Sequence, residues 1–264
     1  MADETLQLEV DARGVATLTM NRPELHNAFD EAMIASLAGK LDGLADRQGV
    51  RVIVLAAQGK SFSAGADLNY MKRAAVFTRE ENVDDALALG RMLLRLRTMP
   101  VPTVAVVQGA AYGGGVGLVA ACDIALATEA ALFGLTETRL GLIPSMISPF
   151  VIAAIGAQQA RRYFQTAERF SAAEARRLGL VQEVVTDEGA LEARVGAVVD
   201  QILATGPEAA AHAKKLVFDV GGLSIDEALL RDLAGRIADR RASDEGVEGI
   251  SAFLERRRPR WAPG

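Results

Sequence analysis

Short apolar runs in the first half of the chain predict β-strands. Residues 6–10 and 15–20 alternate or nearly alternate between apolar and polar side chains. Arg13 and Gly14 lie between the two runs, so this segment predicts a β-hairpin. Further β-branched or apolar runs predict buried strands at residues 50–57, 103–107, 124–127 and 132–134.

Helical periodicity follows these strands. Asn27 or Asp30 can cap a helix that runs to about Asp46, and its apolar side chains recur on one face. Residues 80–97 predict a second amphipathic helix by the same spacing. Strands and helices that alternate in this way predict an α/β fold of stacked β-β-α units with largely parallel pairing.

The pattern changes at about Gly206. Three helical segments follow, at residues 207–219, 225–240 and 244–258, and none carries a strand pattern. We therefore predict a core over residues 1–205 and a helical region over residues 206–264. The apolar and basic faces of this second region are suited to subunit contacts, although a solvated face explains Arg256 to Arg258 equally simply.

The most unusual stretch is TVAVVQGAAYGGGVGLVAACD, at residues 103–123. Three glycines, residues 113–115, precede a small-residue helix, and the N–H groups at such a helix start favour an anion. Gly115, Gly117 and Ala120 fit a dinucleotide fingerprint, but Asp123 comes too early to hold a ribose. The other readings are a glycine-packed helix, or an oxyanion formed during a reaction, which needs a second amide donor. The small-residue turn at 63–66 can supply that donor.

Composition and charge restrict the partners. The chain has 264 residues, half of them hydrophobic, and a net charge of −5, which gives no basic field for nucleic acid or membrane lipid. The single cysteine, Cys122, excludes an internal disulfide, and the acidic start lacks a signal-peptide pattern, so we expect a cytoplasmic protein. Proline and glutamine interrupt the uncharged runs 98–122 and 140–160, which predicts core rather than membrane spans. The spacing of His26 and His212 suggests no metal site.

Four motifs in order carry a family resemblance: NRPELHNA at residues 21–28, FSAGADL at 62–68, GAAYGGGVGLVAACDIALA at 109–127 and GLTETRLGLIP at 134–144. With residues 161–185 and the terminal GISAFLERRRP, they resemble the enoyl-CoA hydratase/isomerase (crotonase) superfamily over nearly the whole chain. The resemblance implies a spiral of ββα turns, and trimers that often pair into hexamers. It also implies an acyl-CoA thioester substrate, with coenzyme A entering as part of that substrate and no separate cofactor.

The resemblance also assigns a mechanism. Two backbone amides, those of Ala64 and Gly114, would bind the thioester oxygen as it gains enolate charge. Glu137, which completes the F-G-x-x-E pattern from Phe133, would move the protons. Further residues would bind the substrate, the last two of them reaching the coenzyme A of a neighbouring subunit: Glu24, Leu25, His26, Ala28, Ser63, Ala66, Asp67, Leu68, Gly117, Phe253 and Arg256.

One position departs from many hydratases of the family. They carry a second glutamate three residues after the oxyanion glycine, and this chain has Gly117 there. In a hydratase, Glu137 would therefore be the single group that moves protons. In the alternative, a Δ3-Δ2-enoyl-CoA isomerase, it would carry a proton from one carbon to another.

The amino-acid sequences of several motifs are most similar to those of bacterial methylglutaconyl-CoA hydratases of leucine degradation. Lys72, Arg73 or Arg139 would then pair with the distal carboxylate of the substrate. A third reading is a non-catalytic relative that binds RNA or serves as a scaffold, which the acidic charge and Glu137 both disfavour.

Overall fold

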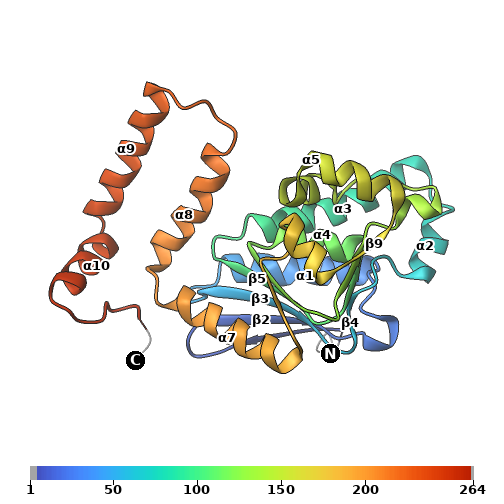
Figure 1. The fold of residues 1–264 in the computed structure, drawn as a ribbon, viewed down its shortest axis with the longest axis horizontal. Coiled ribbons are helices and arrows are strands. Elements are labelled where there is room, and N and C mark those ends of the chain that lie inside the picture. Colours follow the sequence, from blue (N-terminus) through green and yellow to red (C-terminus); the bar gives the residue numbers. More distant parts are fainter. Residues whose placement is uncertain (1–4, 263–264) are drawn as a thin grey trace.

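The computed structural model describes residues 5–262 and contains two β-sheets with helices around them (Figure 1). The larger sheet has six strands in the order β1-β2-β3-β5-β7-β10. The hairpin of β1 and β2 is antiparallel, with Leu6 opposite Met20, and the other neighbours pair in parallel. The bounds are Leu6–Val10 for β1, Val15–Met20 for β2, Val52–Ala57 for β3, Thr103–Val107 for β5, Ile124–Thr128 for β7 and Glu183–Val185 for β10.

The smaller sheet has four short strands in the order β4-β6-β8-β9. They are β4 (Ser61–Ser63), β6 (Ala110–Tyr112), β8 (Leu132–Gly134) and β9 (Arg169–Ser171). From β3 to β8 the chain alternates between the sheets, since β3, β5 and β7 enter the large sheet and β4, β6 and β8 enter the small one. This alternation is the repeating turn of the expected spiral, and the α/β prediction is confirmed.

Ten α-helices and two 3-10 turns are assigned within residues 5–262. Asp30, rather than Asn27, caps the first helix, because its carboxylate accepts the N–H of Met33 at 2.9 Å. The side chain of Asn27 is buried and donates to the carbonyls of Gln58 and Ser61. The bounds are α1 Glu31–Ala45, α2 Leu68–Ala74, α3 Arg79–Arg97, α4 Gly114–Ala121, α5 Ser148–Thr166, α6 Ala172–Leu178, α7 Glu188–Leu203, α8 Pro207–Val220, α9 Glu227–Ala242, α10 Asp244–Leu254, η1 Pro23–Leu25 and η2 Glu137–Leu140.

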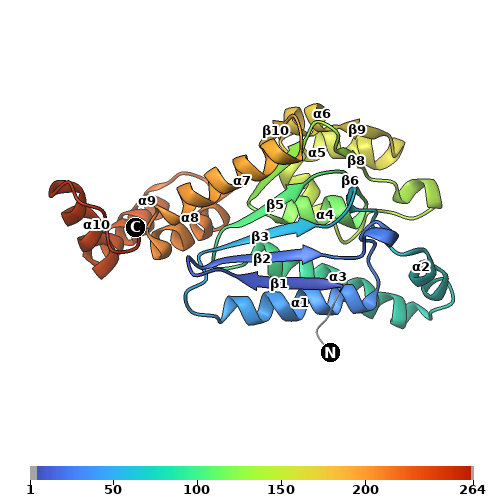
Figure 2. The ribbon, with the colours of Figure 1, turned by 90° about the horizontal axis from the view of Figure 1, so that it is seen from below.

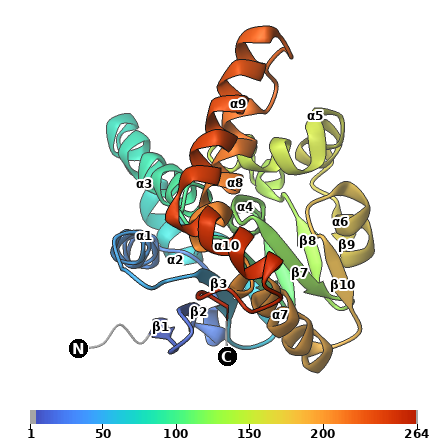
Figure 3. The ribbon, with the colours of Figure 1, turned by 90° about the vertical axis from the view of Figure 1, so that its left-hand side faces the viewer.

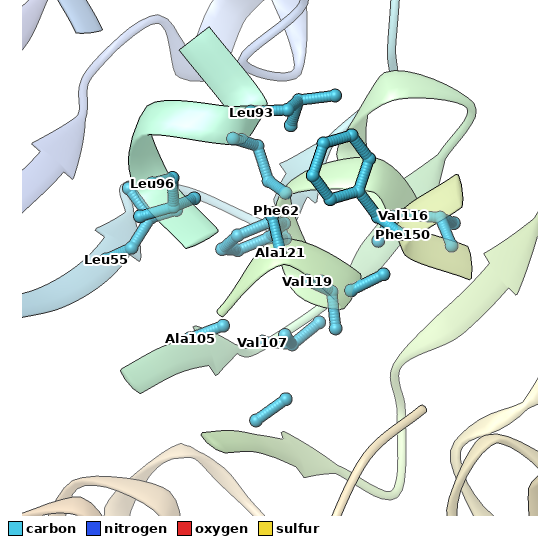
Figure 4. Close-up of a cluster of buried hydrophobic side chains, with 14 of the residues drawn as sticks. Leu55, Phe62, Leu93, Leu96, Ala105, Val107, Val116, Val119, Ala121 and Phe150 are labelled. Carbon is cyan, nitrogen blue, oxygen red and sulfur yellow. The ribbon is translucent and has the colours of Figure 1, made fainter. Parts of the chain in front are cut away.

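The core lies on both faces of the large sheet (Figure 2). On one face, α4 packs between strand β5 and helix α3, where Val119, Val107 and Leu93 belong to one buried cluster (Figure 4). On the other face, α7 packs Val198 and Val199 against valines of β2, β3 and β5. The residues of α4 from Gly115 to Ala121 are all buried, and this packing fixes the position of its N-terminus.

Helices α8 and α9 extend from one end of the core (Figures 1 and 3). Neither helix contains a buried residue within this chain, and apolar side chains such as Val217, Ile225 and Ile237 are exposed. Lys214 anchors α8 to the core through Asp123, with a separation of 2.7 Å between Nζ and the carboxylate. Over residues 5–262, no helix is both long enough and apolar enough to cross a membrane.

Candidate active site

Three turns that follow neighbouring parallel strands meet at one edge of the small sheet. Strand β6 pairs in parallel with β4 on one side and with β8 on the other. The turn at Ala64 follows β4, Gly113 follows β6, and Glu137 follows β8. Since the carboxyl ends of parallel strands lie together, these turns enclose one pocket of about 400 Å³ lined by Ala64, Ala66, Gly114 and Glu137.

The first two turns are in backbone contact. Gly113 has a φ of 50°, and its N–H donates to the carbonyl of Gly134 at 2.9 Å. Gly65 has a φ of 86°, and a Cβ there would lie 2.9 Å from the carbonyl oxygen of Tyr112 and 3.6 Å from the nitrogen of Gly114. Only glycine permits this approach without strain, so both turns require it.

The hydrogen bonds of the 64–67 turn correct one predicted role. The N–H of Ala64 donates to the carbonyl of His26 at 2.9 Å and therefore cannot serve a ligand. Within residues 5–262, no group accepts the N–H of Ala66 or that of Gly114. The amide pair available to an oxyanion is thus Ala66 with Gly114, and the prediction for Ala64 as a donor is wrong, although Ala64 lines the pocket.

Glu137 supplies the carboxylate of the pocket. It begins the turn η2, and its Oε1 lies 3.1 Å from the point that a Cβ on Gly113 would occupy. Its Oε2 is buried without a hydrogen-bond partner among the described residues. Burial raises the pKa of this carboxyl group above its ordinary value, because a charged carboxylate loses solvation there. An unpartnered carboxylate beside two free amides is an arrangement for proton transfer next to a developing oxyanion.

Ser63, Asp67 and His26 support the turn rather than line the pocket. The hydroxyl of buried Ser63 donates to the carbonyl of Asn27 at 2.8 Å and accepts the N–H of Gly65. Asp67 caps α2 by accepting the N–H groups of Asn69 and Tyr70. The ring of His26 shares a hydrogen bond with the hydroxyl of Ser61 at 2.9 Å.

The remaining predicted binding residues divide into three groups. Ala66 and Leu68 line the pocket. Glu24 and Leu25 are exposed on η1 and Ala28 is buried behind it, and in the described chain these three lie outside the pocket lining. Phe253, 82% exposed on α10, and Arg256 also lie outside the lining, and their contact with a neighbouring subunit stays a prediction.

Sequence reasoning missed several pocket residues. Phe29 places its ring against Gly114, where a Cβ would lie 2.8 Å from Cε2. Tyr70 and Asp85 come from α2 and α3, and residues 140–147 form another wall. The apolar sequence LGLIPSMI at 140–147 could have indicated an apolar pocket wall. The position of Phe29 could not be predicted in this way, because it depends on the parallel bridge of Phe29 with Ala66.

Comparison with known proteins identifies the family. The model of the enoyl-CoA hydratase/isomerase family matches residues 11–263. The chain belongs to this family. A solved enoyl-CoA hydratase from Shewanella pealeana is 41% identical with a TM-score of 0.93, covering 97% of this chain and 96% of that one. Pseudomonas aeruginosa AtuE is 40% identical with a TM-score of 0.93, covering 98% and 100%. A Thermus thermophilus protein provisionally named an enoyl-CoA hydratase is 36% identical over 255 residues, 96% of this chain and 100% of the relative. The crotonase-type fold is confirmed.

Gly117, where many hydratases of the family have a second glutamate, lies outside the pocket lining in the described chain. A Cβ at Gly117 would lie 2.4 Å from Cγ2 of Ile147 and 3.4 Å from Cδ1 of Leu93. Ile147 itself lines the pocket, so an apolar side chain fills the place from which a second acid would project. The pocket lining of the described chain therefore contains one glutamate, Glu137.

Replacing Gly117 tests this packing. Gly117→Ala is expected to lower the free energy of unfolding by about 1–3 kcal/mol, because the stiff branched side chain of Ile147 must move. Gly43→Ala is the matched control, since a Cβ there meets nothing within 4 Å and alanine favours the helix. Urea unfolding compares the two, and equal stability of Gly117→Ala and the native protein would contradict the packing.

Proposed function

We propose that the protein is an enoyl-CoA hydratase that adds water across the α,β double bond of an acyl-CoA thioester. The observation that carries the proposal is the buried, unpartnered Oε2 of Glu137 in the pocket that contains the free N–H groups of Ala66 and Gly114. Such an arrangement suits a reaction that needs one proton carrier and places negative charge on one oxygen.

In the proposed reaction, the thioester oxygen accepts the N–H groups of Ala66 and Gly114. The Glu137 carboxylate removes a proton from water while the hydroxide oxygen bonds to the β carbon. The π electrons move toward the thioester, and the resulting enolate oxygen is stabilised by the two amides. Glu137 then returns the proton to the α carbon, which regenerates the carboxylate. One carboxyl group thus serves both halves of a syn addition.

Double-bond migration is the second candidate. A Δ3-Δ2-enoyl-CoA isomerase needs the same enolate stabilisation and one base that carries a proton from one carbon to another. The packing of Ile147 at Gly117 favours this alternative, because among the described pocket residues Glu137 is the one glutamate and no second glutamate helps to orient water. The two reactions differ in whether water enters the product.

The acyl group in our proposal is uncharged. The ionisable pocket residues of the described chain are Tyr70, Asp85 and Glu137, and most other lining side chains are apolar. Arg73, one of three cations considered for a distal carboxylate, is paired with Glu31 at 2.6 Å. Lys72 and Arg139 are exposed and outside this lining. Methylglutaconyl-CoA, with its second carboxylate, is the competing substrate.

The region from residue 206 is proposed as the subunit-contact region of a homotrimer or a dimer of trimers. Helices α8 and α9 leave apolar side chains exposed, which supports a role in association. Phe253 and Arg256 are proposed to reach the coenzyme A bound by a neighbouring subunit, where a guanidinium suits a phosphate.

A panel of acyl-CoA thioesters tests these choices. We expect crotonyl- and hexenoyl-CoA to lose the absorbance of the conjugated enoyl group as 3-hydroxyacyl products form. Mass spectrometry separates hydration, which adds one water, from isomerisation, which leaves the mass unchanged. Faster turnover of methylglutaconyl-CoA than of crotonyl-CoA would reverse the choice of acyl group. Absence of turnover on the whole panel would remove the enzymatic proposal.

A further inference from the structure

A partly buried hydrogen bond ties α2, the helix that follows the amide turn, to α3. Tyr70 lies in the first turn of α2 and is 9% exposed. Its hydroxyl donates to Oδ2 of Asp85, which lies on α3. Both residues line the pocket that contains Ala66, Gly114 and Glu137. The bond therefore joins α2 to α3 within the wall of the pocket.

Short contacts connect Tyr70 to Ala66. The N–H of Tyr70 donates to Oδ1 of Asp67 at 3.1 Å. The N–H of Asp67 donates to the carbonyl of Phe29, and the N–H of Phe29 donates to the carbonyl of Gly65, each at 2.7 Å. Ala66 thus lies in a segment whose direction is set before it by the bridge to Phe29 and after it by α2.

Helix α2 has few other anchors of its own. It is seven residues long, and Tyr70 is its one buried residue among those the structure describes. Among the described residues, a second side-chain contact connects α2 to another helix. It is the ion pair of Arg73 with Glu31 on α1, in which both side chains are about half exposed. Exposed ion pairs fix a position weakly. The partly buried bond of Tyr70 with Asp85 is therefore the stronger restraint on the helix.

We propose that Tyr70 and Asp85 are a positioning pair that holds the Ala66 N–H at the place of the thioester oxyanion. The inference rests on the proposed function, because it assigns that oxygen to Ala66 and Gly114. Without the bond, α2 shifts relative to α3, and the amide at its start loses alignment with the oxygen while the pocket walls remain. The pair acts through Ala66 and touches no reacting atom.

The ionisation of the Tyr70 hydroxyl suits this task. Burial, followed by the hydrogen bond to Asp85, raises the pKa of the Tyr70 hydroxyl well above its ordinary value. The phenol accordingly stays protonated and remains a donor throughout the neutral pH range.

The test compares Asp85→Ala with Asp85→Asn. Asparagine retains an oxygen that accepts the Tyr70 hydroxyl, whereas alanine removes the acceptor. Asp84→Ala is the matched control, because Asp84 is the preceding residue on α3, is exposed and lies outside the pocket lining. Tyr70→Phe is a second variant that loses the donor and keeps the ring, should Asp85→Ala fold poorly.

Two readouts separate positioning from simple packing. The first is kcat and KM for crotonyl-CoA. The second is the red shift of a chromophoric cinnamoyl-CoA thioester on binding, which reports hydrogen bonding to its carbonyl without turnover. We expect Asp85→Ala to lower kcat about tenfold, to leave KM within about twofold and to diminish the red shift. Asp85→Asn is expected to restore both, and Asp84→Ala to leave both unchanged.

Three results would overturn the inference. They are an unchanged kcat and red shift in both Asp85→Ala and Tyr70→Phe, a raised KM with unchanged kcat, and an Asp85→Asn variant as impaired as Asp85→Ala. The last two would make Asp85 a substrate contact or a required charge. A native protein that neither turns over crotonyl-CoA nor shifts the chromophore would instead remove the proposed function.

Discussion

Glu137→Gln is expected to lower kcat for hydration by about 10²–10⁴-fold. Glutamine has nearly the same shape, but it cannot take a proton from water or return one to the α carbon. Binding of a saturated thioester such as butyryl-CoA is expected to stay within about twofold, since the amides of Ala66 and Gly114 remain. Steady-state rates and calorimetric Kd values measure the two effects separately.

The control for this variant is Glu129→Gln. Glu129 is exposed and lies away from the pocket lining, so its rate is expected to match that of the native protein. Activity of Glu137→Gln within threefold of the native rate would move the proton-transfer role to another group. A large loss of butyryl-CoA affinity would mean that Glu137 chiefly holds the ligand.

The raised pKa of Glu137 adds a pH dependence. The reactive form is the carboxylate, so kcat/KM is expected to fall on the acid side at a pH above the ordinary glutamate pKa. The pH dependence of stability has the opposite sign to that of kcat/KM, because the folded state binds the Glu137 proton more tightly than the unfolded state does. The free energy of unfolding therefore decreases as pH rises through the window between those two pKa values, and Glu137→Gln removes this contribution.

An amide-to-ester replacement at residue 66 is expected to lower kcat by about 10²–10³-fold, the usual cost of losing one oxyanion donor. Incorporation of lactic acid in place of Ala66 changes the N–H to oxygen and keeps the methyl side chain. The variant thus removes the one N–H group of residues 64–67 for which the described chain offers no acceptor. Crotonyl-CoA turnover measures the effect.

The same replacement at residue 64 is the matched control. There the N–H serves the carbonyl of His26, so its loss is expected to reduce stability by about 1 kcal/mol and to leave kcat nearly unchanged. A greater loss of kcat at residue 64 than at residue 66 would reinstate Ala64 as the donor.

Local patterns predicted most strands of the large sheet, the helices α1 and α3, and the helices after residue 206. The hairpin of β1 and β2 and the strand β5 have the predicted bounds, because alternation and β-branched runs identify strands of five or six residues. The small sheet was not predicted beyond β8, because three-residue strands such as β4 and β6 carry no period of their own. Helix α5 was missed because Pro149 and Gly156, which has a φ of 77°, interrupt its pattern.

Only part of the candidate site was predicted, because local patterns do not show which distant segments come into contact. The family motifs brought Gly114 and Glu137 to attention, and both line the pocket. The choice between Ala64 and Ala66 was beyond local analysis, since both are alanines of one turn. It depends on the His26 carbonyl, which reaches Ala64 from a distant part of the chain. Tyr70 and Asp85 face each other only after α2 and α3 pack.

The proposed functional groups of the pocket lie in three separate loops, each of which follows one of three neighbouring strands. The amide groups come after β4 and β6, and the acid comes after β8. A change in the third loop can therefore replace the proposed proton carrier while the two proposed amide donors, which lie in the other loops, are kept. Evolution or redesign can use this separation. Substitutions in the loop after Gly134 can change the reaction that the enolate undergoes, while the two proposed amide donors to the thioester oxygen stay in place.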